Sequence, residues 1–343
     1  MEEWKLERGA ETVIRKWIRL KKQERMCIVT SDQHYQEALL LEAAARKTGA
    51  AVSLMFVEQE GIHVGTYFDE NPNIFNPYDV IIGASDYSIL TTKAAERAME
   101  KSKRLLSMPL ATTSGESMLG FEFMTADPDR VYARGMQVLK AIPLPRKAHI
   151  TTRLGTDLWI SMNGRTPTVF NGQFWPGHHF SSSSFEICIP ILEHCTSGVL
   201  VCDGSFSYIG RAREPVRMIF EDVRITEIED TAEGNRLKEY FESYEDPEMY
   251  VAGELGIGLN PKSRCIGECY IEDESCLGTF HLGMGRNIGL GGIHHASGHF
   301  DLVTKSPDIE IDGIRIMKEG AFVKHLPAPD EPAEEARMTL MWQ

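Results

Sequence analysis

Short apolar runs alternate with amphipathic segments from the start of the chain to about residue 145. The runs MCIVTS, AAVSLMFVE and YDVIIGAS have the length and β-branched content of buried strands. Between them, HYQEALLLEAAARKTG has helical spacing and ends at Gly49, a common helix-capping residue. Strands that alternate with helices predict a parallel sheet covered by helices, so we expect a Rossmann-like α/β domain over residues 1–145.

From about residue 146 the pattern becomes that of strands separated by glycine turns. It is seen in HITTRLGTDLWISMNG, GVLVCDGSF, PVRMIFEDVRITEIE and DIEIDGIRIMKEGAF, with one helical segment, NRLKEYFESYE, among them. The run SSSS, residues 181–184, reads as a turn or loop. These features predict a β-rich α+β domain over residues 146–328 and an α/β fold class for the chain. The remainder, residues 329–343, is rich in proline and acidic residues, which predicts a mobile tail.

Composition restricts the class of partner. A net charge of −14 argues against nucleic acid, which needs a basic face to displace counterions. No apolar run approaches the roughly 18 residues that span a bilayer, so we expect no membrane contact. The N-terminal segment predicts an amphipathic helix that turns Trp4, Val13, Trp17 and Leu20 toward the protein, rather than a secretory signal. Seven scattered cysteines suggest reduced thiols, and we expect a cytoplasmic protein.

The segment GHFDLV places a histidine and a carboxylate on one face of a predicted strand. His299 and Asp301 are two residues apart, and alternate residues of a strand point the same way. An imidazole and a carboxylate directed at one point are typical of a metal site. The alternative is an ordinary hydrogen bond between the two side chains within a sheet.

Three further polar residues lie in apolar or glycine-rich surroundings. Glu254 interrupts the run VAGELGIGLNP, where a carboxylate is costly unless it is paired or binds metal; the alternative is an exposed edge-strand glutamate. His281 lies among glycines that allow close approach of backbone or substrate; the alternative is a buried histidine bonded to a carbonyl. Glu186, within FEICIPI, is a candidate ligand or general base.

Substrate contacts are expected from a second group of residues in the same half of the chain, and other chemistries lack their motifs. The candidates for substrate binding are His178, His179, His295 and Arg286. No Gly-x-Ser-x-Gly elbow, P-loop or dinucleotide fingerprint is present. Cys265, Cys269 and Cys276 lack the paired spacing of a structural zinc site.

The ordered segments GELGIGLNP, DESCLGTFHLGMGRN and HASGHFDLV resemble the aminopeptidase T/aminopeptidase S family of metallopeptidases over about residues 174–320. The resemblance implies that Glu254 bridges two metal ions and that His281, His299, Asp301 and Glu186 complete the ligand set. One departure is that the family's tyrosine shortly after the His281 position is missing, since the run here reads GMGRNIG.

The segment DPEMYVAGELGIGLNP also resembles the 2,5-dihydroxypyridine 5,6-dioxygenases, mononuclear non-haem iron enzymes of the same fold. That resemblance places a histidine at the position of Glu254 and keeps the His-x-Asp pair. With Glu254, the equivalent triad has one histidine and two carboxylates, whereas the usual iron triad has two histidines and one carboxylate. An inward-pointing His281 would restore the usual count.

These residues favour a metal-dependent hydrolase of the aminopeptidase T type. A water activated by one or two divalent ions (Zn, Mn or Co) would attack an amide or C–N bond of a small-molecule or short-peptide substrate. Glu254 and Glu186 are its candidate catalytic carboxylates, and we expect a homo-oligomer. The alternative enzyme is an Fe(II)-dependent ring-cleaving dioxygenase, and a third interpretation is a non-catalytic binding protein.

Overall fold

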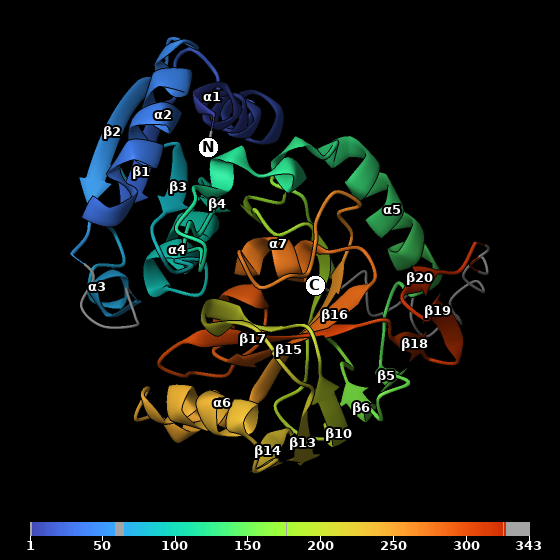
Figure 1. Cartoon of the computed structure of the whole chain (residues 1–343). Coiled ribbons are helices and arrows are strands. Elements are labelled where there is room, and N and C mark those ends of the chain that lie inside the picture. The colour runs from blue at the N-terminus through green and yellow to red at the C-terminus, as the bar shows by residue number, and fades with distance from the viewer. Residues whose placement is uncertain (1, 59–64, 176, 325, 327–343) are drawn as a thin grey trace.

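The computed structural model describes residues 2–58, 65–175, 177–324 and 326. A parallel sheet flanked by helices lies at one end of the molecule, and a larger β-rich region carries the rest of the chain (Figure 1). The expected α/β fold class is confirmed. The tail predicted at 329–343 lies outside the described residues. Among the described helices, none combines the length and apolar character that crossing a membrane requires.

The parallel sheet has five strands in the order β2–β1–β3–β4–β8. Their bounds are Arg25–Thr30 (β1), Ala51–Phe56 (β2), Val80–Ala84 (β3), Arg104–Ser107 (β4) and Phe180–Ser182 (β8). β8 lies beyond residue 145 yet pairs in parallel with β4, so the sheet draws on both predicted domains. The expectation of a loop at SSSS is therefore wrong for its first two residues, and the division into domains at residue 145 stays a prediction.

Strands β1 and β3 are buried on both faces, which explains why they are continuous apolar runs rather than alternating ones, whereas the edge strand β2 is partly exposed. Met26 and Ile28 of β1 point into the main core, whereas Cys27 and Val29 pack in a second cluster on the opposite face. The helices of this region are α1 (Glu3–Thr12), continued by a π-helical turn (Val13–Ile18), α2 (Tyr35–Arg46), α3 (Gly65–Glu70), α4 (Lys93–Glu100) and α5 (Pro128–Ala141).

The N-terminal helix packs largely as its amphipathic pattern predicts. Val13, Trp17 and Leu20 are buried, and the Trp17 ring lies 5.1 Å from that of Phe185. Trp4 was expected to face the protein but is 52% exposed, so that expectation is wrong. The guanidinium of Arg8 and the amine of Lys5 lie over its ring, which therefore packs against helix side chains instead of the core.

The β-rich region contains two further sheets. An eight-stranded sheet runs β14–β13–β10–β6–β5–β18–β19–β20, and a seven-stranded antiparallel sheet runs β12–β11–β17–β16–β15–β9–β7. The first comprises Lys147–Thr151 (β5), Asp157–Ser161 (β6), Ser197–Cys202 (β10), Val216–Glu221 (β13), Arg224–Ile228 (β14), Asp308–Ile311 (β18), Ile314–Lys318 (β19) and Ala321–Phe322 (β20). The second comprises Thr168–Phe170 (β7), Glu186–Pro190 (β9), Ser205–Phe206 (β11), Gly210–Arg211 (β12), Ala252–Gly258 (β15), Thr279–Gly285 (β16) and His299–Lys305 (β17).

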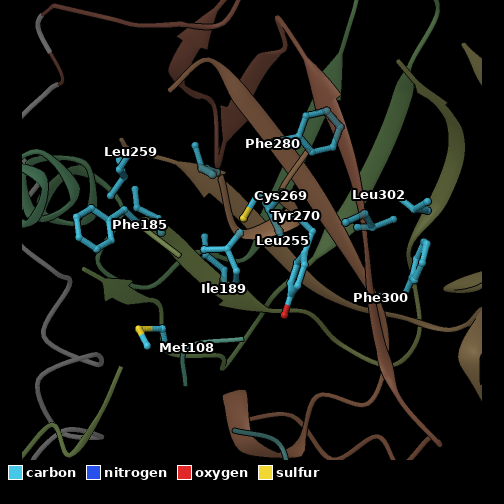
Figure 2. Packing of buried hydrophobic residues seen from close by; sticks show 14 of the residues in the cluster. Met108, Phe185, Ile189, Leu255, Leu259, Cys269, Tyr270, Phe280, Phe300 and Leu302 are labelled. Atoms are coloured by element: carbon cyan, nitrogen blue, oxygen red, sulfur yellow. The ribbon is translucent and has the colours of Figure 1, made fainter. Parts of the chain in front are cut away.

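The seven-stranded sheet has one apolar face and one face rich in polar side chains and glycine. Leu255, Phe280 and Leu302, from three adjacent strands, belong to the buried apolar cluster (Figure 2). Helix α7 (Tyr270–Ser275) contacts β15, β16 and β17, while α6 (Ala232–Glu242) packs against β13 and β14. The alternation along each strand therefore determines which residues can meet at a common site.

Candidate metal centre

Four neighbouring strands bring the five expected ligand-type residues to one face of the seven-stranded sheet. Glu186 begins β9, Glu254 lies in β15, His281 lies in β16, and β17 supplies both His299 and Asp301. Alternation holds along each strand, since the intervening Leu255, Leu282 and Phe300 are fully buried in the core. Residues as far apart in the sequence as Glu186 and Asp301 thus belong to one cluster because their four strands are consecutive in the sheet.

Glycines on the adjacent strands make room for these side chains. Gly283 pairs with both Glu254 and Asp301, and Gly256 pairs with His281. Gly258 and Gly285 stand opposite Glu186 and His299. A Cβ added at Gly256 would lie 1.9 Å from His281 Nε2, and one at Gly283 would lie 2.8 Å from the Glu254 Cβ. The glycine-rich sequence therefore creates space for a polar cluster inside a packed sheet.

The side-chain atoms converge on one another. His299 Nε2 is 3.2 Å from both Glu254 Oε2 and Asp301 Oδ1. His281 Nε2 is 2.9 Å from Glu186 Oε2 and 4.0 Å from carboxylate oxygens of Glu254 and Asp301. Glu254, His299 and Asp301 form one group with the spacing of metal ligands, and Glu186, Glu254 and His281 form another.

Glu274 completes the cluster and was not among the residues predicted from the sequence. It lies in helix α7 and forms a third ligand-type group with His281 and Asp301. Burial raises the pKa of Glu274 well above its usual value, and the charges of Asp301 and Glu186 raise it further. The available signal was the acidic DES of DESCLG directly before an apolar strand, but burial of those residues depends on how α7 packs.

The electrostatics of the cluster reflect four carboxylates with two imidazoles. Burial lowers the pKa of His281, but Glu186, Asp301 and Glu254 outweigh it and raise the pKa to about 9. Burial likewise opposes protonation of His299, and Asp301 and Glu254 raise its pKa well above the usual value. Burial raises the pKa of Glu186, despite the opposing effect of His281. Such a cluster attracts positive charge, supplied either by protons or by a cation.

The donor set fits a divalent cation. Glu186 Oε2 and Asp301 Oδ1 are buried and lack a hydrogen bond of good geometry, which is costly unless a cation satisfies them. His299 donates from Nδ1 to the main-chain oxygen of Arg286 at 2.9 Å, leaving Nε2 directed at the carboxylates. A second hydrogen bond of this kind is typical of metal-binding histidines.

The cluster lines a pocket whose volume, with its open mouth included, is about 490 Å³. Its walls come from both predicted domains. Ser88, Leu90 and Thr91 follow β3 of the parallel sheet, whereas Tyr208 and Tyr270 belong to the β-rich region. Tyr208 lies in a 3₁₀ turn (Ser207–Ile209). The centroid of its ring is 4.5 Å from that of the Tyr270 ring.

The sequence matches the model of the 2,5-dihydroxypyridine 5,6-dioxygenase (NicX) family over residues 14–324. The chain belongs to this family. A 2,5-dihydroxypyridine 5,6-dioxygenase of Pseudomonas putida KT2440 is 26% identical over 288 residues, which cover 74% of this chain and 79% of that protein.

Two solved structures share the fold of this NicX-family chain. The 2,5-dihydroxypyridine dioxygenase structure from Pseudomonas putida KT2440 superposes with a TM-score of 0.77 at 17% identity, covering 95% of this chain and 99% of the other. AmpT from Thermus thermophilus superposes with a TM-score of 0.63 at 16% identity, covering 94% and 99%. The resemblance to the aminopeptidase T type is thus supported at the level of the fold, whereas the family is that of the dioxygenases.

The four residues expected to bind substrate do not line this pocket. The His178 ring stacks on the ring of Phe180, with 5.1 Å between their centroids. The main-chain oxygen of His179 accepts a hydrogen bond from the main-chain nitrogen of Leu105. His295 is exposed. A role in substrate binding stays a prediction for these histidines.

Arg286 does not line the pocket, and its role in substrate binding stays a prediction. It is buried, and its guanidinium binds both carboxylate oxygens of Asp69 in α3, at 2.8 and 3.0 Å. Asp69 also accepts a hydrogen bond from the main-chain nitrogen of Lys93, at the start of α4. Because the main-chain oxygen of Arg286 holds His299, this ion pair joins the helices beside the parallel sheet to a ligand-type histidine.

Proposed function

We propose that this chain is a metal-dependent dioxygenase that opens the ring of a hydroxylated N-heterocycle, of which 2,5-dihydroxypyridine is the first candidate. The family match over residues 14–324 carries the proposal. The buried cluster of ligand-type residues supports it, because it lines a pocket that also carries aromatic side chains. This choice replaces the hydrolase that the sequence favoured.

Glu254, His299 and Asp301 would hold the ion. When bound, a divalent iron ion supplies redox chemistry with O₂ and a binding position for a substrate oxygen. His299 is held by the Arg286 carbonyl with Nε2 facing inward, so its orientation is set before any ion binds. Residues of helix α7 and of the loop after β3 line the pocket together with these ligands. Glu186, with its raised pKa, is a candidate to hold a proton beside His281.

One observation favours a second candidate function, a metallohydrolase. The cluster contains four carboxylates and two histidines in three overlapping ligand groups, more donors than one ion requires. A carboxylate at position 254, where the dioxygenase resemblance implies histidine, suits a pair of ions that share a bridging ligand. Two ions of that kind would activate a water for attack on an amide or C–N bond.

An oxygen electrode distinguishes the two candidates. Protein purified without oxygen is analysed for its metals, loaded with Fe(II), and mixed with 2,5-dihydroxypyridine or with leucine p-nitroanilide. We expect one O₂ consumed for each hydroxypyridine ring opened, no turnover under strict anaerobiosis, and no cleavage of the anilide. The His299→Ala variant serves as a control for metal-independent oxidation. Anaerobic cleavage of the anilide, with two metal equivalents bound, would contradict the dioxygenase and support the hydrolase.

A further inference from the structure

Tyr270 occupies an unusual position in the pocket wall. It is the first residue of α7, one helical turn before Glu274, and both line the pocket. Residues four apart lie on the same face of a helix, so the phenol and the carboxylate face the same space. Among the described residues that line the pocket, Tyr270 alone has a buried hydroxyl that makes no hydrogen bond of good geometry, although the Tyr208 hydroxyl lies near it. Figure 2 shows this hydroxyl at the margin of the apolar side chains that surround the ring.

The surroundings keep the Tyr270 hydroxyl protonated. Burial raises the pKa of Tyr270 well above its usual value, and the neighbouring Tyr208 and Glu274 raise it further. The group is therefore a neutral donor at any physiological pH. Leaving a buried donor without an acceptor costs roughly 1–3 kcal/mol, so an acceptor that enters the pocket gains binding free energy from this contact.

The other side chains that line the pocket indicate which kind of molecule can carry such an acceptor. Four carboxylates form the base of the pocket and repel a free anion, so a negatively charged or electron-rich oxygen is stabilised only near a cation or a donor. Phe170, Leu290 and the Tyr208 ring supply apolar surface to the same lining. This combination suits a flat aromatic ring that carries an oxygen substituent.

We infer that Tyr270 is a substrate-binding residue that donates a hydrogen bond to an oxygen substituent of the ring, with Tyr208 packing against that ring. The inference rests on the proposed function and adds to it the group that recognises the hydroxylated substrate. The phenol distinguishes hydroxylated rings from unsubstituted ones, because only the former offer it an acceptor.

Equilibrium binding tests this assignment without turnover. Calorimetric titrations under nitrogen compare wild type with Tyr270→Phe, using 2,5-dihydroxypyridine, 2-hydroxypyridine and 3-hydroxypyridine as ligands of the metal-loaded protein. We expect Tyr270→Phe to weaken 2,5-dihydroxypyridine binding about 5- to 30-fold, the loss of one hydrogen bond. Of 2-hydroxypyridine and 3-hydroxypyridine, only the one whose oxygen accepts the Tyr270 hydrogen bond should lose affinity, by the same factor. The metal content of Tyr270→Phe should equal that of wild type.

Tyr240→Phe is the matched control. Tyr240 also has a buried hydroxyl without a partner, but it does not line this pocket. Its loss should leave all three affinities unchanged. If wild type binds 2,5-dihydroxypyridine and Tyr270→Phe binds it equally well, the inference is wrong while the proposed function stands. If wild type binds no hydroxypyridine, the proposed function fails and the inference fails with it.

Discussion

At the scale of single residues, the side chains of β17 are the most direct test of the metal centre. His299 and Asp301 point to the same face and approach each other at 3.2 Å. We expect His299→Ala and Asp301→Ala each to lower the bound metal at least tenfold, with folding retained, since each change removes a ligand without emptying the apolar core. Mass spectrometry of the purified proteins gives the metal content.

The control for these variants is His295→Ala, an exposed histidine of the preceding segment. It should retain the metal of wild type. Wild-type metal content in both β17 variants would show that these residues form only a hydrogen-bonded pair, the alternative that the sequence left open.

A second residue-scale prediction concerns His34, which lies between β1 and α2. Its Nε2 is 2.8 Å from Asp86 Oδ1. Burial lowers the pKa of His34, but Asp86 and Glu37 outweigh burial and raise the pKa to about 9. A folded-state pKa above the unfolded value of about 6.5 means that the pair stabilises fully below pH 6.5 and loses this contribution as pH rises through 9.

We therefore compare wild type with His34→Gln in urea unfolding across pH 6 to 9.5. The difference in their free energies of unfolding should shrink by up to roughly 3 kcal/mol over this range. Other titrating groups cancel in the difference. Two parallel stability curves would show that the pKa of His34 is the same in the folded and the unfolded state.

Sequence periodicity predicted the ligands on strands better than those on helices. A period of two places His299 and Asp301 on one face whatever the neighbouring strands are, so their proximity followed from local geometry. Glu274 was missed because the six-residue helix α7 is buried by tertiary packing, which no local pattern reports. Arg286 was a candidate for substrate binding, and its ion pair with Asp69 was not expected because the two lie 217 residues apart in the sequence.

At the scale of elements, the ligand-type residues stand opposite glycines on neighbouring strands. Metal binding should therefore be sensitive to substitution of Gly256, although this residue has no side chain to bind metal. Gly256→Ala would place a Cβ 1.9 Å from His281 Nε2 and 2.7 Å from Glu186 Oε2. We expect this variant to lose most of its metal because two side chains must move apart. Metal titration against a competing chelator measures the loss.

Gly9→Ala is the matched control, since its Cβ would lie 1.9 Å from the main-chain oxygen of Leu119, away from the cluster. It should lower the unfolding midpoint without changing metal affinity. Equal metal affinities in Gly256→Ala and wild type would mean that the cluster adapts, and that the glycine register is incidental to the site.

The first strands of the parallel sheet were predicted from their apolar runs, and burial on both faces accounts for the runs of β1 and β3. Strand β8 was not predicted, since serine has little preference for strands. Its strand conformation depends instead on pairing with the edge of β4. The function, too, could be predicted only in part from local sequence patterns. One donor set serves hydrolases and dioxygenases, so the residues alone favoured a hydrolase where the family relationship points to a dioxygenase.

At the scale of the whole molecule, the Asp69–Arg286 pair connects the two halves next to the metal centre. Asp69→Asn keeps an acceptor for the Lys93 main chain but leaves the buried guanidinium without its counter-charge. We expect a loss of roughly 2–3 kcal/mol in stability and about tenfold weaker metal binding, since the Arg286 carbonyl that holds His299 would shift. Thermal unfolding and chelator competition report the two effects separately.

Glu24→Gln provides the comparison, because Glu24 forms a similarly shielded ion pair with Arg104 at 2.6 Å, within the N-terminal half. It should lower stability while leaving metal affinity as in wild type. If both variants weaken metal binding alike, the effect of Asp69 is general destabilisation rather than positioning of His299.

The position of β8 has a consequence for how the chain is made. β4 ends at Ser107, whereas β8 begins at Phe180, so about 70 residues leave the ribosome between the two. At roughly 5–20 residues per second this interval lasts roughly 4–14 s. During that time the open side of β4 presents unpaired backbone groups, a template for pairing with other nascent chains. Translation pauses between these strands would prolong the interval, and chaperones that shield strand edges should bind at this stage of synthesis.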